Sequence, residues 1–246
     1  MKSIIERLFD IEISRKNKRQ IINEAINLDK NVLFVAIPKT GTTSVRRQMR
    51  PNGVPIIDSP HLNIQQLQDL IYVYCLKQSL GKNYAFPDAG VLSDKEVRIK
   101  SKEVFDNLFK FSAVRNPWAR AVSLYARREG VQVKSKMAFK EFCRHHYLAS
   151  DTCLYPTLHK SQLDWLRNSD GDIIMDYVYK VEEFDEAIIK IKERTNGGLI
   201  LKNIRLNSNP SSNSNSYRDL YDSESRKLVY KNFEEDIDYF KYTFEK

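Results

Sequence analysis

The chain has 246 residues, of which 41% are hydrophobic and 29% are charged, and this length is enough for one sizeable domain with its own core. Lys and Arg number 40 against 32 Asp and Glu, so the formal net charge is +8; the basic residues are scattered and often stand beside acids, which is typical of a solvated surface. Three cysteines are too few for a disulfide framework or a four-cysteine zinc site.

The first thirty residues carry charges throughout and hold no apolar stretch long enough for a signal peptide or a membrane span. We therefore expect a cytoplasmic protein without stable membrane insertion, with a luminal domain cut from a longer chain as the alternative. Apolar residues recur here at helical spacing in two groups, Ile4, Ile5, Leu8 and Ile11 and then Ile21, Ile22, Ala25 and Ile26. Residues 1–30 are predicted to form a helical lead-in that packs on a single domain spanning residues 1–246.

Residues 32–37 form a continuous apolar run that Pro38 ends, a pattern typical of a strand buried on both faces of a parallel sheet. A short helix is predicted over residues 42–50, with Val45 and Met49 on one face, before Pro51-Asn52-Gly53 stops it. The sequence thus predicts a strand, a polar turn and a helix in direct succession.

The polar turn at residues 38–44 reads Pro-Lys-Thr-Gly-Thr-Thr-Ser. Free backbone N–H groups and the positive end of the helix dipole meet at such a turn, which favours an anion. Gly41 lets the backbone approach a phosphate, the three hydroxyls at positions 42 to 44 can donate to its oxygens, and Lys39 adds a positive charge. An ordinary helix cap is the alternative. The turn is not a Walker A loop, because its lysine precedes the glycine.

The middle of the chain continues with a short edge strand predicted at residues 54–57, a helical stripe from Ile64 to Tyr74 and a loop over residues 79–93. Residues 109–114 are the next predicted strand. Asn116-Pro117 has the N-cap and first-turn chemistry that opens a helix.

The remaining elements keep the alternation of strands and helices. Helical patterns are predicted at residues 139–147 and 159–166, a strand at 177–181, a helix from Phe184 to Ile191 and a single last helix carrying Val229, Phe233, Ile237 and Phe240. Residues 207–216 are rich in Ser and Asn and are predicted to be a loop. This order predicts an α/β fold with a mostly parallel central sheet, helices on both faces and a ligand crevice at the strand ends.

Two segments carry a family resemblance. The turn at residues 38–44 resembles the 5′-phosphosulfate-binding loop of the sulfotransferases that use 3′-phosphoadenosine 5′-phosphosulfate (PAPS). Residues 111–125 resemble the motif with which that family binds the 3′-phosphate, an arginine at a strand end and a serine eight residues later; here these are Arg115 and Ser123. A guanidinium offers a planar fork to a phosphate, and Ser123 lies about two helical turns beyond it.

From residue 31 onward the chain resembles in particular the carbohydrate-type branch, which includes the heparan and chondroitin sulfotransferases and their bacterial relatives; residues 176–184 and 217–221 look like later segments of that branch. The resemblance implies a P-loop-like three-layer fold, PAPS as cofactor with 3′-phosphoadenosine 5′-phosphate (PAP) as product, no metal, and direct in-line transfer to an acceptor hydroxyl. A carbohydrate is the expected acceptor, and no nucleic-acid partner is expected.

Sulfuryl transfer requires alignment of the reacting atoms and stabilisation of the negative charge on the leaving phosphate. Lys39 is the residue expected to supply the positive charge that stabilises it. His61, after the predicted edge strand, is the candidate general base; a helix-capping or merely exposed histidine is the alternative, and His145, His146 or His159 could contact the acceptor instead. The residues expected to bind the cofactor are Lys39, Thr40, Gly41, Thr42, Thr43, Ser44, Arg115, Ser123, Tyr217 and Arg218.

The last two of those residues follow the loop at 207–216, which is expected to close over the adenosine and 3′-phosphate, with a solvated linker as the alternative. Two other functions stay open. A P-loop-type nucleotide kinase would need a Mg²⁺-binding acid at a strand end, and only Asp58 comes close. A non-enzymatic module that binds glycan or nucleic acid would need a dense basic patch, and only Arg46-Arg47 and Arg127-Arg128 hint at one. The oligomeric state is left open.

Overall fold

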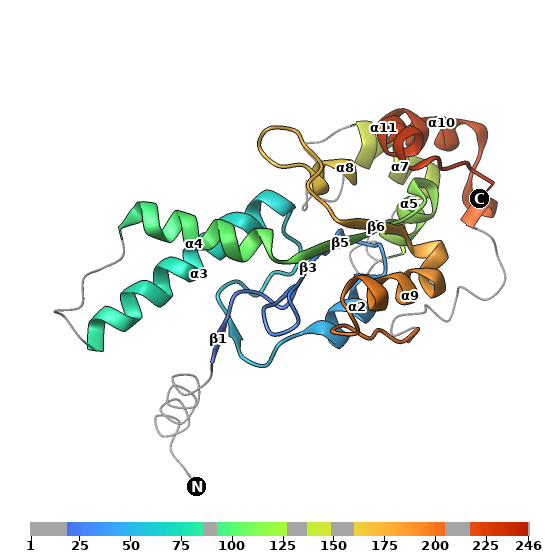
Figure 1. The fold of residues 1–246 in the computed structure, drawn as a ribbon. Helices are drawn as coiled ribbons and strands as arrows, with labels where there is room; N and C mark the ends of the chain where they lie inside the picture. Colours follow the sequence, from blue (N-terminus) through green and yellow to red (C-terminus); the bar gives the residue numbers. More distant parts are fainter. Residues whose placement is uncertain (1–18, 86–92, 127–136, 149–159, 205–216, 246) are drawn as a thin grey trace, which may run out of the picture.

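The computed structural model describes residues 19–85, 93–126, 137–148, 160–204 and 217–245, and Figure 1 shows their arrangement. A four-stranded sheet lies at the centre, in the order β2 (Ile26–Asn27), β3 (Val32–Val35), β5 (Phe109–Val114) and β6 (Tyr177–Lys180). The last three strands run parallel, and β2 pairs antiparallel with β3 at the edge. The predicted mostly parallel sheet is therefore confirmed.

Strand β3 is buried on both faces, as its continuous apolar run predicts. Val32 and Phe34 belong to one hydrophobic core, and Leu33 and Val35 belong to another on the opposite face. Successive side chains of a strand point to opposite faces, so every side chain of β3 faces one of the two helical layers.

Helices cover both faces of the sheet, as predicted. One core contains residues of α2 (Thr42–Met49) and α9 (Phe184–Arg194). The other contains residues of α3 (Ile64–Ala85), α4 (Asp94–Asp106) and α8 (Leu163–Leu166). Figure 1 shows α2 and α9 on one side of the sheet and α8 on the other.

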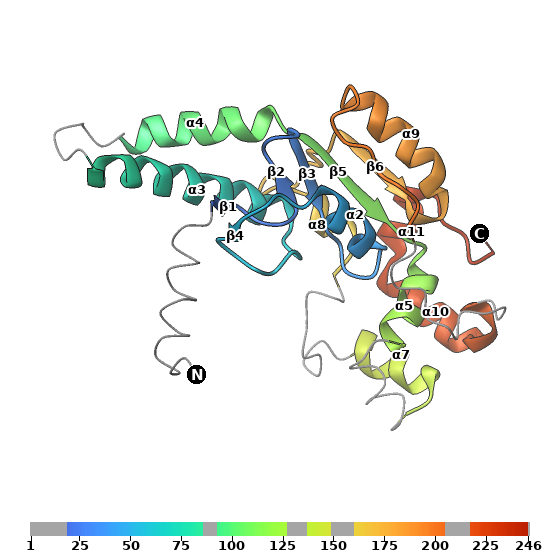
Figure 2. The ribbon, with the colours of Figure 1, turned by 90° about the horizontal axis from the view of Figure 1, so that it is seen from below.

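A third core lies beyond the carboxyl ends of the strands. It is built from α5 (Pro117–Tyr125), α7 (Phe139–Leu148), α10 (Ser223–Asn232) and α11 (Glu234–Phe240), with Tyr217 of the short 3-10 helix η5 (Tyr217–Leu220) packed against it. Figure 2 shows α5, α7 and α10 gathered past the arrowhead of β5. The carboxyl end of the sheet, where ligands bind in parallel α/β folds, is thus flanked by helices from the middle and from the C-terminal part of the chain.

The predicted helical lead-in is not seen in the part of residues 1–30 that the structure describes, which begins at residue 19. Gln20–Ile21 form β1, which pairs in parallel with β4 (Val54–Pro55), and Ile26–Asn27 form β2. These short pairings bury Ile21 and Ile26 against the sheet layer. Burial by tertiary pairing has overridden a helical spacing of apolar residues that was only local.

The predicted loop over residues 79–93 is wrong for its first part, because α3 continues to Ala85. The next helix, α4, was not predicted, although its start carries a recognisable signal: Ser93 accepts a hydrogen bond from the Glu96 N–H, and the Glu96 carboxylate accepts one from the Ser93 N–H. Helices α3 and α4 pack side by side and extend away from the sheet (Figure 2).

The single last helix is also wrong, because the chain breaks at Phe233 into α10 and α11. Phe233 has φ −128° and ψ 26°, outside the helical region, and it ends one helix and precedes the next. Similarly, α8 begins at Leu163 rather than near residue 159. Residue 159 and the loop at 207–216 lie outside the described residues.

Candidate active site

The turn between β3 and α2 has a backbone shape that ordinary residues adopt rarely. Lys39 has φ 70° and Gly41 has φ 71°, both in the left-handed region. Gly41 is the N-cap of α2 and, having no side chain, makes no capping hydrogen bond. The first N–H groups of a helix have no partner within the helix, so this end of α2 has the free donors and the positive dipole that suit an anion.

The hydroxyl groups of the turn divide into two kinds. The Thr40 hydroxyl donates to the Ile37 carbonyl over 3.0 Å and is buried, so only its backbone N–H can face a phosphate. Thr42 is buried, whereas Thr43 and Ser44 are half-buried.

Gly41 is packed against the start of the short 3-10 helix η3 (Val181–Glu183). A Cβ added at Gly41 would lie 3.0 Å from Cγ2 of Val181, which is tighter than ordinary van der Waals contact. The turn therefore needs glycine at position 41 for two reasons, the positive φ and this close approach. The turn after β3 thus contacts the segment that follows β6.

Two arginines from the β5–α5 segment hold the carbonyl groups of the same turn. Arg115, which follows β5, donates from Nη1 to the Lys39 carbonyl over 3.3 Å. Arg120, on α5, donates from Nε to the Pro38 carbonyl over 3.1 Å and from Nη1 to the Lys160 carbonyl over 3.3 Å. A carbonyl oxygen repels an anion. Because the Lys39 and Pro38 carbonyl groups are bound to these two arginines, their repulsion of an anion in the turn is reduced.

The Arg115 guanidinium is poorly solvated. Its burial lowers the pKa below the ordinary value of 12.5, and nearby Glu182, Tyr242 and Tyr217 act in the opposite direction without restoring it. An arginine stays protonated in proteins nonetheless. A cation that has lost water without full compensation from neighbouring acids is one that a bound phosphate would stabilise.

Asn116 is the N-cap of α5 and fixes the backbone next to Arg115. Its side-chain oxygen accepts from the Trp118 N–H over 3.0 Å, its N–H donates to Oε1 of Glu182 over 2.9 Å, and its side-chain amide donates to the Thr243 carbonyl over 2.8 Å. Tyr242 donates its hydroxyl to Oε2 of the same Glu182 over 3.3 Å, and burial is the main reason why the pKa of Tyr242 is raised. The predicted N-cap is confirmed, and the C-terminal segment is tied to it.

His61 lies beside the turn at residues 38–44, the candidate phosphate turn. Its Nδ1 lies 2.7 Å from the carbonyl oxygen of Ala36, just after β3. A carbonyl can only accept, so Nδ1 carries the proton and Nε2 of the neutral ring is the basic nitrogen. The preceding loop is fixed by buried Asn23, whose amide donates to the carbonyls of Ile57 and Ser59 over 2.8 Å each.

Of the remaining predicted site residues, Ser123 is half-buried on α5, and Tyr217 lies close enough to Arg115 to affect its pKa. The Tyr217 hydroxyl donates to the Phe244 carbonyl over 2.5 Å. Arg218 is exposed and bonds to Glu245 at the end of the chain. Tyr217 is therefore near the predicted 3′-phosphate arginine, and Arg218 faces the C-terminus.

His145 and His146 lie on α7, but their side chains are outside what the structure describes, and His159 is outside the described residues altogether.

In the described ranges, no three His, Cys, Asp or Glu side chains form a group that could hold a metal ion. No helix in this described part is long and apolar enough to cross a membrane.

A polar hollow of about 490 Å³ opens at the start of α3. It is lined by Asn63 and Gln65 and by residues in and around α8, namely Lys160, Asp164, Arg167, Asn168, Ser169 and Gly171. Lys160 is also the residue whose carbonyl Arg120 binds. Asn63 of this lining follows His61 by two residues in the sequence. Arg120 joins the Lys160 carbonyl to the Pro38 carbonyl of the phosphate turn.

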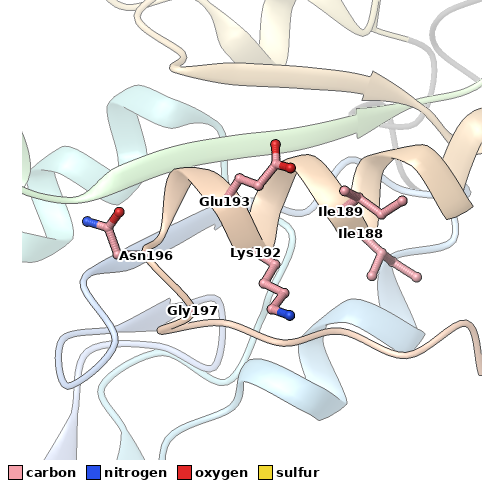
Figure 3. Close-up of a pocket in the computed structure, with 6 residues that line it drawn as sticks. All are labelled: Ile188, Ile189, Lys192, Glu193, Asn196 and Gly197. Atoms are coloured by element: carbon pink, nitrogen blue, oxygen red, sulfur yellow. The ribbon is translucent and has the colours of Figure 1, made fainter.

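A second hollow of about 500 Å³ lies elsewhere, on the outer face of α9 (Figure 3). Its lining includes Ile188, Lys192 and Gly197. The adjoining Gly198 lies near the Lys30 carbonyl, ahead of β3, whereas the phosphate turn follows that strand. This hollow therefore lies toward the opposite end of the sheet and is not a part of the candidate site.

Reasoning from the sequence missed four polar residues around the site: Arg120, Gln162, Glu182 and Asp236. Arg120, Gln162 and Asp236 are almost completely buried. Their only sequence signal is a polar side chain beside apolar neighbours, since charged residues are seldom buried unless they are paired.

The comparisons with known proteins identify a family. The sequence model of the Sulfotransferase family matches residues 25–243. A protein of Archaeoglobus fulgidus described as uncharacterized is 30% identical over 94 residues, which is 38% of this chain and 72% of the relative. No solved structure matches the chain at a significant level. With the family match running from before β3 to the C-terminal segment that binds Asn116, the chain belongs to the sulfotransferase family.

Proposed function

We propose that this protein transfers the sulfuryl group of PAPS to a hydroxyl group of a glycan. The observation that carries the proposal is the contact between two phosphate-binding elements that are far apart in sequence. Arg115, at the end of β5, reaches the Lys39 carbonyl of the turn after β3, with 3.3 Å between Nη1 and the oxygen. A ligand with phosphates at both ends of a ribose fits two such elements side by side.

The 5′ side of the donor is assigned to the turn. The uncapped start of α2 and the close approach that Gly41 permits support this assignment. Thr42, Thr43 and Ser44 would add donors, and Lys39 would add a positive charge. The 3′-phosphate is assigned to Arg115 and Ser123, with Tyr217 and Arg218 at the edge of that site.

The donor supplies a sulfuryl group whose bond to the bridging oxygen breaks as its bond to the acceptor oxygen forms. His61 takes the acceptor's proton on Nε2, because Nδ1 is already protonated against Ala36. Lys39 neutralises the charge that develops at the leaving 5′-phosphate. The protein otherwise holds the reacting atoms in line.

The acceptor is assigned to the polar hollow whose lining includes Asn63, two residues after His61 in the sequence. Its lining has amides, a hydroxyl, two cations and an acid, and such groups exchange hydrogen bonds with a sugar more readily than they accommodate an apolar phenol or sterol. This lining supports a glycan acceptor.

Calorimetric titration tests the donor. The wild-type protein should bind PAP and bind ATP much more weakly, with or without Mg²⁺. Arg115→Ala should weaken PAP binding by about tenfold or more, the usual loss for a charge-assisted hydrogen-bond pair. A preference for ATP with Mg²⁺ would support a kinase and end the proposal.

Transfer assays with PAPS and unsulfated chondroitin or heparosan test the chemistry. Lys39→Ala should abolish transfer while the protein stays folded, and His61→Ala should abolish transfer while PAP binding is kept. Full transfer by His61→Ala would move the base elsewhere, and transfer to p-nitrophenol in preference to either polysaccharide would contradict the glycan acceptor.

A further inference from the structure

The main chain of Arg115 is held by a buried side chain from a distant segment. Oε1 of Gln162 accepts from the Arg115 N–H over 2.8 Å, and Nε2 of Gln162 donates to the Arg115 carbonyl over 2.9 Å. Gln162 has no exposed surface. Its planar amide therefore pairs with both backbone groups of Arg115 as a peptide of a neighbouring strand would.

This pairing begins where the sheet ends. Strand β5 ends at Val114, whose register partner in β6 is Lys180, the last residue of that strand. Arg115 is the next residue and has no partner strand to hold it. Without Gln162, its N–H and carbonyl would need another partner, since buried main-chain groups are almost always hydrogen-bonded.

Gln162 is itself held by hydrogen bonds from its own segment to Asp236 of α11. The Asp236 carboxylate, which is fully buried, accepts from the Gln162 N–H over 2.7 Å, from the Leu163 N–H over 3.0 Å and from the Ser161 hydroxyl over 2.6 Å. It also lies 3.4 Å from the side-chain nitrogen of Gln162. A carboxylate with this many donors holds the segment before α8 in one conformation.

These bonds fix the direction in which the Arg115 side chain leaves the backbone. The direction of the Cα–Cβ bond is set by the backbone of the residue, and here both backbone polar groups are tied. At the other end, the guanidinium reaches the Lys39 carbonyl. A preorganised donor binds its anion without first losing conformational freedom.

We propose that Gln162 is a positioning residue that gives this site its preference for a ligand with a 3′-phosphate. The inference rests on the proposed function, because it takes Arg115 as the residue that binds the 3′-phosphate. Gln162 does not touch the ligand. It acts by holding Arg115 in the place where that phosphate arrives.

The experiment compares two ligands that differ only in the 3′-phosphate, PAP and AMP, by calorimetry. Gln162→Met keeps the length of the side chain and removes both bonds to Arg115. The ratio of the AMP dissociation constant to the PAP dissociation constant should fall about tenfold, while AMP binding should change by about twofold or less. A residue with a merely structural role would weaken both ligands together.

Gln48→Met is the matched control. Gln48 makes the same kind of paired bond to another main chain, since its Oε1 accepts from the Lys202 N–H over 2.7 Å and its Nε2 donates to the Lys202 carbonyl over 3.0 Å. Its Nε2 also donates to the Ser44 carbonyl over 2.9 Å, on the 5′ side that PAP and AMP share. The loss of Gln48 should therefore change the binding of both ligands alike and leave their ratio unchanged. If Gln162→Met does not fold, Gln162→Asn is used instead, because it keeps an amide near Asp236 but is one methylene too short to hold Arg115, and it should lower the ratio in the same direction.

The outcomes separate the two proposals. A wild-type protein that binds PAP no better than AMP would defeat the proposed function itself. A wild-type preference for PAP that Gln162→Met or Gln162→Asn retains in full would leave the proposed function standing and overturn the role of Gln162.

Discussion

At the scale of single residues, the phosphate turn has an uncommon backbone conformation. Lys39 adopts a left-handed φ of 70° although it is not glycine, and such a conformation costs about 1 kcal/mol or more for a residue with a Cβ. The bonds that Arg115 and Arg120 make to the carbonyls of Lys39 and Pro38 offset that cost. Strain that is held in this way by its surroundings is typical of a functional turn.

Gly41→Ala tests that constraint. The substitution adds left-handed strain and a contact of 3.0 Å with Val181, so we expect a loss of unfolding free energy of about 1–3 kcal/mol and weaker PAP binding. Urea denaturation and calorimetry measure the two effects.

Gly197→Ala is the control for Gly41→Ala, because Gly197 has φ 79° and a Cβ there would meet nothing within 4 Å. It should lower stability by the strain alone, about 1 kcal/mol, and leave PAP binding as it is. Equal losses of PAP affinity in the two variants would contradict a specific role for the turn.

At the scale of elements, charged side chains join α7 to α10. Lys140 on α7 lies 2.9 Å from Asp222 and 2.8 Å from Glu224, and Arg144 also pairs with Glu224. Asp222 is at the same time the N-cap of α10, with Ser225 completing the capping box. The hydrogen bond from the Ser225 N–H, and then the one from Lys140, hold the pKa of Asp222 well below its ordinary value of 3.8.

The lowered pKa predicts how acid affects this junction. A carboxylate whose pKa is depressed by folding stabilises the folded state above about pH 4, and that contribution is lost as the pH falls. Asp222→Asn keeps an N-cap side chain but removes the charge. The melting temperature of the wild type should therefore fall more steeply below pH 4 than that of Asp222→Asn.

Thermal melting from pH 7 to pH 2 measures this difference. At pH 7 the variant should melt only about 1–2 °C lower, because the ion pair is exposed and screened by solvent. Asp219→Asn, at an exposed acid three residues earlier, should follow the wild-type curve. Parallel curves for wild type and Asp222→Asn would show that this carboxylate does not couple folding to pH.

At the scale of the whole molecule, the central sheet separates two apolar layers and the third core closes the carboxyl end. Phe111 lies in the middle of β5 with no exposed surface, and its ring lies 5.0 Å from that of Phe34 and 5.7 Å from that of Phe109. This aromatic group supports the strand that ends at Arg115.

Phe111→Ala should lower the free energy of unfolding by about 3–5 kcal/mol, because it leaves a cavity in a closely packed layer. Ile189→Ala is the comparison, since Ile189 is 59% exposed on α9 and should cost about 0.5 kcal/mol or less. Urea denaturation measures both. A cost below about 1 kcal/mol for Phe111→Ala would mean that this part of the sheet is not tightly packed.

Much of the site follows from the sequence alone. The apolar run at residues 32–37, the glycine in the turn and the Asn116-Pro117 helix start are local signals, because burial on both faces, positive φ and N-capping act within a few residues. The strands and helices predicted around them, β3, α2, β5 and α5, are confirmed, and these elements carry the turn at residues 38–44 and Arg115. The helix predicted before residue 30 and the loop predicted at residues 79–85 are wrong for the same reason. A local pattern of residues contains no information about a distant packing partner.

Only the tertiary structure decided which distant groups complete the site. Gln162 meets Arg115 across 47 positions of the sequence, Asp236 meets Gln162 across 74, and Arg120 meets Pro38 across 82. Nothing in the neighbours of these residues indicates a partner, because hydrogen bonds between buried polar groups depend on how the layers pack and not on local conformation. The sequence by itself determined the strand, the turn and the cations, and the packing of α8 and α11 against the sheet end determined where those cations are held.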